Sequence, residues 1–150
     1  MGLTNLKITG RAGMAAFLPN QPILHDCIAA LDGDAVLQPG DAVALSAGAE
    51  PKNAIVVEPA GDAQPIGVIV YNTITSGFKN LDRVSVFPVG SYVQLPAGEA
   101  TITRGAAVAF DKNGQVVAAE SGAVIGIAYT EPSAVGDLIA VHIEPATLTA

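Results

Sequence analysis

The one cluster of chemically reactive residue types in the sequence is His25-Asp26-Cys27. If this stretch is a β-strand, alternate side chains share a face, so His25 and Cys27 would converge as soft metal ligands. A structural zinc site needs further ligands, and the sequence has one other histidine, His142, and no second cysteine. We therefore expect a half-buried strand with a small apolar thiol here, and no metal site.

Catalytic arrangements are equally sparse. A Cys27–His142 nucleophile pair would form only if the first and last strands met, and neither residue has a recognisable nucleophile setting around it. The carboxylates sit beside Gly or Pro, where Asp is favoured for local turn hydrogen bonds. The glycines lack the strand–loop–helix context of a phosphate-binding loop. The sequence predicts no enzyme, no cofactor and no metal.

The composition bounds the class of protein. The 150 residues suit one domain, and half of them are hydrophobic, which is enough for a core. Much of that half is Ala and Val, and only 5% of residues are aromatic, so we expect thin layers of small side chains between closely packed sheets.

The charge pattern argues against several partners. The formal net charge is -7 and the seven basic residues are scattered, so no nucleic-acid partner is expected. The sequence shows no signal peptide and no apolar run long enough to cross a bilayer. We expect no membrane partner and synthesis in the cytoplasm of the cell that makes the protein. A single cysteine excludes a disulfide-built scaffold.

Glycine and proline, 16 and 10 residues, divide the chain into short β-rich segments joined by tight turns. This pattern predicts an all-β fold, a small β-barrel or β-sandwich of about ten short strands. The strongest turn signal is Asn113-Gly114. The expected strands are Ile23–Ala30, Ala42–Ser46, Ala54–Glu58, Ile66–Tyr71, Arg83–Pro88, Tyr92–Leu95, Ala107–Phe110, Val116–Ala118, Ile125–Tyr129 and Leu138–Ile143.

Three phrases recur in the same order. PGDAVAL at 39–45 aligns with RGAAVAF at 104–110, PIGVIV at 65–70 aligns with VIGIAY at 124–129, and DRVSV at 82–86 aligns with DLIAV at 137–141. Two such units cannot each bury a sheet face alone, but together they can close a barrel or sandwich. The repeat therefore predicts two related units within a single β domain at 21–150, preceded by an N-terminal arm at 1–20.

The same phrases resemble a known family. LQPGDAVALS, PIGVIVYNT, PAGEATITRG, DKNG, IGIA and GD, at residues 37–137, resemble the small capsid decoration proteins of tailed bacteriophages, also called structural cement proteins. The resemblance is weak over the first 35 residues. It implies a non-enzymatic virion protein on the outer surface of the icosahedral capsid, which bridges neighbouring major capsid protein subunits and stabilises the shell. It also implies a homo-oligomer, a dimer or a trimer.

Two segments are candidate contacts with the capsid or a sister subunit. The arm Gly2–Phe17 is mildly basic, carries apolar residues and lacks clear strand partners, although it could equally be a frayed terminus. The loop Asn72–Leu81 is longer than its counterpart in the second unit; Phe78 would be exposed there as an anchor or would instead plug the barrel end. The candidate contact residues are Leu3, Leu6, Lys7, Ile8, Arg11, Phe17, Phe78 and Lys79.

The rival class is a non-catalytic binding or adhesion module for carbohydrate or a host surface. Sugar sites usually offer aromatic platforms beside polar side chains, and this chain has only Tyr71, Tyr92 and Tyr129 and no Trp. The composition therefore favours the capsid role over the adhesive one.

Overall fold

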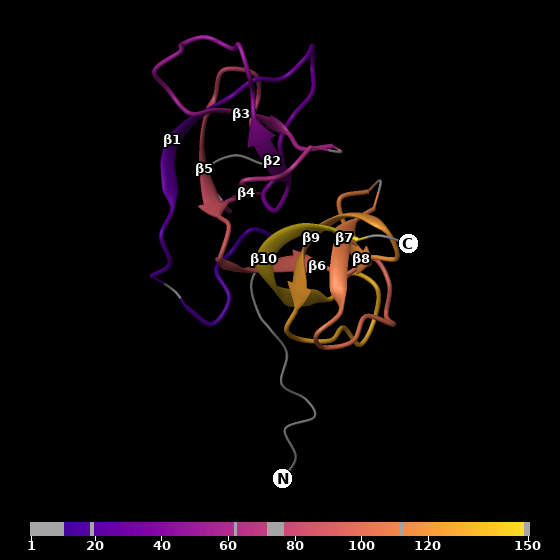
Figure 1. Cartoon of the computed structure of the whole chain (residues 1–150). Helices are drawn as coiled ribbons and strands as arrows, with labels where there is room; N and C mark the ends of the chain where they lie inside the picture. The colour runs from indigo at the N-terminus through magenta and orange to yellow at the C-terminus, as the bar shows by residue number, and fades with distance from the viewer. Residues whose placement is uncertain (1–10, 19, 62, 72–76, 112, 149–150) are drawn as a thin grey trace.

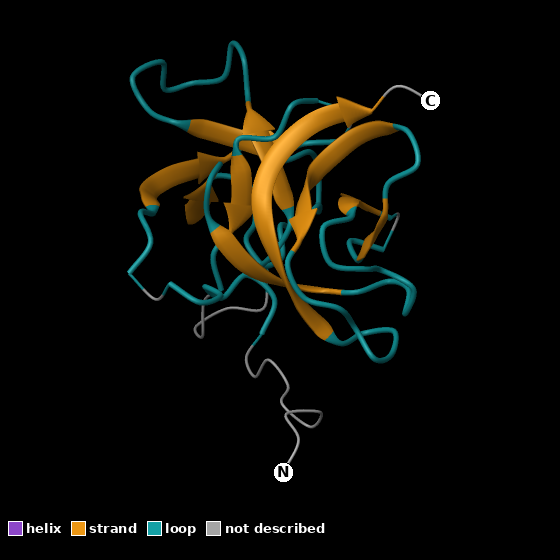
Figure 2. Cartoon of the chain, turned by 60° about the horizontal axis from the view of Figure 1, so that its bottom comes forward, coloured by secondary structure: helices purple, strands orange, loops and turns teal. Residues whose placement is uncertain are grey.

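The structure, a computed structural model, describes residues 11–18, 20–61, 63–71, 77–111 and 113–148. Ten β-strands and no helix occur in these residues (Figure 2), which confirms the all-β prediction. Three strands have the predicted bounds, and the last is five residues longer than predicted. The strands are β1 Leu24–Ala29, β2 Ala42–Leu45, β3 Val56–Pro59, β4 Gly67–Ile69, β5 Arg83–Pro88, β6 Tyr92–Pro96, β7 Ala107–Phe110, β8 Val116–Ala118, β9 Gly122–Ala128 and β10 Leu138–Leu148.

The strands form two bodies, one from each half of the chain (Figure 1). Strands β1 to β5 close into a barrel in the order β1-β3-β2-β4-β5, and β5 pairs back onto β1. Strands β6 to β10 form a sheet in the order β6-β10-β9-β7-β8. A parallel bridge between Ala97 and Val116 joins the ends of β6 and β8, so the second sheet also curls toward closure. The architecture is therefore barrel-like; we refer to the two bodies as the first and second barrels.

The predicted repeat is confirmed by the topology. Let β6 correspond to β1, β7 to β2, and so on up to β10 and β5. The strands of the second sheet then have the same neighbours as the corresponding strands of the first barrel. The parallel pair β1–β3 corresponds to the parallel bridge Ala97–Val116. The aspartates of the third phrase also match: Asp82 Oδ2 accepts a hydrogen bond from the Lys79 amide at 2.7 Å, and Asp137 Oδ2 accepts one from Ala134 at 3.1 Å.

The two Ile-Gly phrases match in a further way. Gly67 begins β4 and faces β5, and Gly126 lies in β9 and faces β10. A Cβ atom at Gly67 would overlap the carbonyl oxygen of Phe87, and one at Gly126 would overlap the carbonyl oxygen of His142. The glycines are therefore required by close approach of two backbones.

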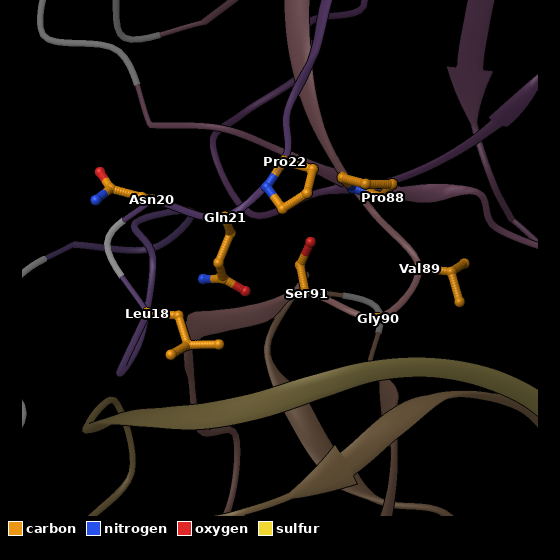
Figure 3. Close-up of a pocket in the computed structure, with 8 residues that line it drawn as sticks. All are labelled: Leu18, Asn20, Gln21, Pro22, Pro88, Val89, Gly90 and Ser91. Carbon is orange, nitrogen blue, oxygen red and sulfur yellow. The ribbon is translucent and has the colours of Figure 1, made fainter.

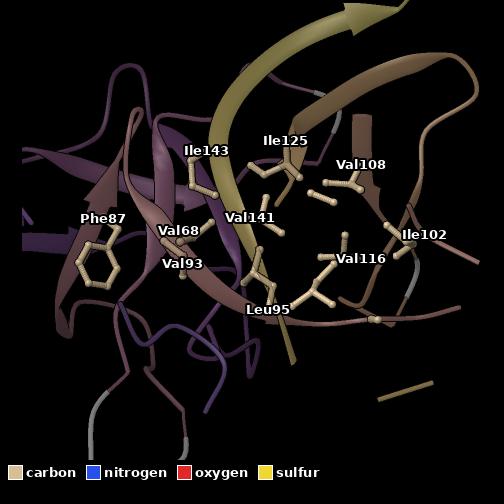
Figure 4. Packing of buried hydrophobic residues seen from close by; sticks show 13 residues of the cluster. Val68, Phe87, Val93, Leu95, Ile102, Val108, Val116, Ile125, Val141 and Ile143 are labelled. Carbon is tan, nitrogen blue, oxygen red and sulfur yellow. The ribbon is translucent and has the colours of Figure 1, made fainter. Parts of the chain in front are cut away.

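Two apolar clusters fill the molecule. The interior of the first barrel holds Cys27, Leu37, Ile69 and Val86 among others. The interior of the second barrel holds residues from β6 to β10, and Val68 and Phe87 of the first barrel join this cluster (Figure 4). The junction between the barrels is thus an apolar core and not a linker, which is the arrangement that a single domain requires.

One turn of the first barrel carries strain that its counterpart avoids. Leu81 has φ of 71°, and the matching residue Gly136 has φ of 91°. Their amides make equivalent hydrogen bonds, to the carbonyls of Ala29 and Ala97, both at 2.7–2.8 Å. A leucine in the left-handed region costs about 1–2 kcal/mol, and Leu81 is 69% exposed, so it recovers little by burial.

We therefore expect Leu81→Gly to stabilise the protein by about 0.5–1 kcal/mol, because relief of strain outweighs the entropy cost of glycine. The midpoint of thermal unfolding should rise by about 2 °C. Val36→Gly, at another exposed apolar position where φ is not positive, is the control and should lower it. A lower melting temperature for Leu81→Gly would contradict the strain interpretation.

Strand β1 departs from the regular alternation that the sequence suggested. Its pairing with β5 shifts register between Leu24 and Cys27, and Asp26 has φ of 60°. This bulge turns the His25 side chain out to solvent while Cys27 is fully buried in the first barrel. The prediction that His25 and Cys27 share one face is therefore wrong.

The part of the N-terminal arm that the structure describes is attached to the second barrel. The amides of Gly13 and Ala16 donate to the carbonyls of Gln94 and Tyr92, both at 2.9 Å, and the amide of Gln94 donates to Met14 at 2.8 Å. Gln94 Nε2 also donates to the carbonyl of Ala15. The segment thus pairs with the free edge of β6, and the expectation that residues 2–17 lack strand partners is wrong for residues 13–16.

Candidate protein-docking surface

The predicted contact residues are scattered in the structure. Leu3, Leu6, Lys7 and Ile8 lie outside the described residues. Arg11 is exposed, and its guanidinium carbon lies 6.0 Å from the centre of the Tyr71 ring. Lys79 is exposed on the loop before β5.

Phe78 does not form the exposed anchor that was one of its two expected roles. Its side chain is 5% exposed and belongs to the core of the first barrel, where its backbone pairs with Leu37. The alternative expectation, that Phe78 plugs the barrel end, is compatible with this buried placement. Lys79 is thus the exposed member of the pair.

Phe17 has a different environment and lies in a row of aromatic rings on the second barrel. Its ring centre is 6.0 Å from that of Tyr92, which stacks on His142 at 4.6 Å and meets Tyr129 edge-on at 5.2 Å. The rings come from the arm segment, β6, β10 and the end of β9. We call Phe17, Tyr92, Tyr129 and His142 the aromatic face.

The aromatic face is open to solvent in the single chain. Phe17 is 60% exposed and Tyr129 is 44% exposed. Glu144 lies beside the face, with Oε2 3.4 Å from Nδ1 of His142. Large aromatic side chains that combine an apolar ring with a polar tip are enriched at protein-contact surfaces.

The backbone at Phe17 is strained. Its φ is 61°, a left-handed conformation that a bulky residue rarely adopts and that costs on the order of 1–3 kcal/mol. The strain directs a ring into solvent, so the folding of the single chain does not account for it. Such a residue at a surface suggests a contact that forms only with a partner.

The two tyrosines of the face are linked. A hydrogen bond with Tyr92 raises the pKa of the Tyr129 phenol, and the negative charge of Glu144 acts in the same direction. We expect Tyr92→Phe to lower the pKa of Tyr129 toward the ordinary value, because the partner oxygen is removed and the ring stays. Titration of tyrosinate absorbance at high pH measures this, and Tyr71→Phe is the control. A Tyr129 titration midpoint that is the same in Tyr92→Phe as in the native chain would mean that the two phenols do not interact.

A hollow adjoins the aromatic face, at the connection between the two barrels. Its volume is about 490 Å³, and Leu18 and Val89 lie at opposite ends of it (Figure 3). Both are more than half exposed, at 53% and 52%. Gln21, in its wall, fixes the neighbouring Tyr92: Nε2 donates to the Tyr92 carbonyl at 2.8 Å and Oε1 accepts from its amide. Leu18 of the hollow follows Phe17 of the aromatic face in the chain, so the hollow lies near that face and could receive an apolar protrusion of a partner.

The reactive residues of the sequence are not brought together. Cys27 is enclosed in the first barrel, where burial raises the pKa of its thiol, and His142 lies on the outside of the second. Within the described part of the chain no three His, Cys, Asp or Glu side chains cluster as metal ligands do. In the same residues no helix has the length and hydropathy to span a bilayer.

The sequence analysis named Phe17 as a candidate contact residue and did not name the other three rings. Tyr92, Tyr129 and His142 are separated by 37 and 13 positions in the chain, and only the pairing of β6 and β9 with β10 places them side by side. Alternation along a strand predicts which side chains point outward, but the strand order is also needed to predict that these three rings lie side by side.

The sequence itself matches a known family over most of its length. A model of the family described as structural cement protein (E217 gp24/Pam3 gp6) covers residues 6–144. No curated protein matches the chain. The match includes both barrels, the segment paired with β6 and the end of the arm from Leu6 onward, and the chain therefore belongs to the phage structural cement protein family.

Proposed function

We propose that this protein stabilises a phage head by binding to the outer surface of the capsid and bridging neighbouring major capsid protein subunits. The family assignment supports a structural role in the capsid. The structure adds two features that bridging needs: a stiff body, because two small barrels share one apolar core, and an exposed aromatic face. The proposal includes no catalytic step.

The arm supplies the contact with the capsid in this proposal. Residues 13–16 hold the arm on β6 at the side of the second barrel. The sequence places Leu3, Leu6 and Ile8 in residues 1–10, with Lys7 as a cation. A segment of this kind can add a strand to the edge of a sheet in a capsid subunit. Ten residues reach at most about 33 Å when fully extended, which sets the greatest distance from the body at which this segment could bind.

The test is binding to expanded, empty phage heads. The full chain should co-sediment with the heads and raise the melting temperature of the shell. Deletion of residues 2–10 should abolish both effects and leave the protein's own melting temperature unchanged, since the pairing of 13–16 with β6 is kept. A larger deletion, of residues 2–17, would be uninformative because it removes that pairing.

Two variants of unchanged length test whether the apolar side chains of the arm contribute to binding. Leu3→Ser, Leu6→Ser and Ile8→Ser combined should weaken binding to the heads by at least about a hundredfold. Thr4→Ser and Thr9→Ser combined should not. Full binding by the deletion variant would overturn the role of the arm. Failure of the native chain to bind heads, together with binding to host-surface glycans on an array, would favour the adhesion module instead.

A further inference from the structure

We infer that the aromatic face binds an arginine side chain of a partner protein, which stacks on the exposed rings and pairs with the carboxylate of Glu144. The inference deepens the proposed function and rests on it for the partner, since the arginine would belong to a major capsid protein subunit. Three features of the molecule support it: the arrangement of the rings, the position of Glu144 and the distribution of cations in this chain.

The rings of the face offer electron-rich surfaces to solvent. Phe17 and Tyr129 meet the ring of Tyr92 edge-on, at interplanar angles of 66° and 76°. Phe17 is 60% exposed and Tyr129 is 44% exposed, whereas Tyr92 is stacked on His142. The face of an aromatic ring carries partial negative charge and attracts a cation. Phe17 and Tyr129 are therefore the rings on which a cation from a partner could sit.

Glu144 adds a full negative charge beside these rings. It follows His142 by two residues in β10, and its side chain is 57% exposed. Oε2 lies 3.4 Å from Nδ1 of His142, whereas Oε1 makes no hydrogen bond or ion pair within the described residues. The pKa of the Tyr129 phenol is raised, mainly by a hydrogen bond with Tyr92 and also by the charge of Glu144. The field of this carboxylate thus reaches the exposed ring.

The cations of the chain are used elsewhere. Each of its three arginines has a partner within the chain, and the pairs are Arg11 with the Tyr71 ring, Arg83 with Asp26 and Arg104 with Glu131. No ion pair or cation–π contact joins a lysine or arginine of the described residues to the aromatic face. The Arg11–Tyr71 pair is thus a contact of the kind that the aromatic face lacks in the single chain.

Arginine suits this surface better than lysine does. Its guanidinium is planar, so it can stack on a ring and also donate two parallel hydrogen bonds to a carboxylate. The net charge of -7 favours approach of a basic patch on the partner. Contact with the guanidinium would also offset the backbone strain that holds the Phe17 ring in solvent.

The first experiment titrates the full chain with N-acetyl-arginine amide and follows the aromatic rings by NMR. The resonances of Phe17 and Tyr129 should shift in a saturable manner, whereas those of Tyr71, which already has a cation, should not. Glu144→Gln should raise the dissociation constant about tenfold, because the carboxylate is lost. Glu120→Gln, at another exposed glutamate, is the matched control and should leave the constant unchanged. N-acetyl-lysine amide should bind more weakly than the arginine probe.

A second variant tests the ring instead of the charge. Tyr129→Leu keeps an apolar side chain at an exposed position and should raise the dissociation constant about three- to fivefold, because leucine has no aromatic face. The melting temperature of each variant verifies that it is folded. The inference would be overturned by the absence of a saturable shift, by equal affinity for the two probes, or by a constant that neither variant changes.

Binding to expanded, empty heads is measured separately and distinguishes this inference from the proposed function. Glu144→Gln and Tyr129→Leu should both weaken binding to heads, and Glu120→Gln should not. If the native chain binds heads and both variants bind them equally well, the arginine contact is refuted and the capsid role stands. If the native chain binds the arginine probe but not heads, the arginine site is supported and the capsid role is contradicted.

Discussion

Replacing Gly126 by alanine is expected to destabilise the protein by about 3–5 kcal/mol, the range of the most severe single substitutions. The added Cβ would overlap the carbonyl oxygen of His142 on β10, which is backbone and cannot rotate away. The strands β9 and β10 would have to separate, and they make the most extensive pairing in the second barrel, six residue pairs from Val141 to Leu148. The melting temperature should fall by about 10 °C or more.

The repeat supplies a matched test. Gly67→Ala should have a similar effect in the first barrel, since its Cβ would overlap the Phe87 carbonyl. Gly48→Ala is the control: its φ is 78° but nothing lies near the added atom, so only backbone strain of about 1 kcal/mol is expected. Gly126 has no positive φ, so Gly126→Ala reports steric overlap and Gly48→Ala reports backbone strain without overlap. Equal losses in the two variants would show that strand approach does not require the glycine.

Phe87→Ala is expected to cost about 3–5 kcal/mol as well, because a nearly buried phenyl ring is removed where the two barrels share a core. If residues 21–150 are a single domain, as the sequence predicts, both barrels should lose stability together. Urea unfolding should then show one transition, with a lower midpoint and an unchanged slope.

Hydrogen exchange of backbone amides shows which barrel responds. Protection should fall in β1–β5 and in β6–β10 by the same factor. Phe78→Ala, which removes a ring inside the first barrel only, should give the same uniform loss if the two barrels unfold as one unit. A variant in which only one barrel loses protection would show two domains. Val36→Ala, at a 43% exposed side chain, controls for loss of surface apolar groups.

Local patterns in the sequence were sufficient to predict the β-strands. Short β-rich segments between glycine and proline predicted all ten strands, and the bounds of β5, β7 and β8 were correct. The order of the three repeated phrases also predicted two related units. These features are encoded locally, because alternation and turn residues act over a few positions.

The docking surface could not be predicted in the same way. Phe78 and Phe17 both occur in segments that the sequence pattern predicts as loops. Phe78 is buried in the first barrel, whereas Phe17 is exposed and has a strained backbone. His25 and Cys27 separated because a bulge at Asp26 breaks the period of two. Tyr92, Tyr129 and His142 meet because β10 pairs with both β6 and β9.

Short segments thus specify strands and turns, since each depends on its own side chains and on neighbours a few residues away. Which rings share a surface depends on strand order, register and bulges, which are set by pairing between segments tens of residues apart. The residue types and their spacing predicted no catalytic cluster. The aromatic face can be recognised only from the pairing of β10 with β6 and β9, which brings its rings together.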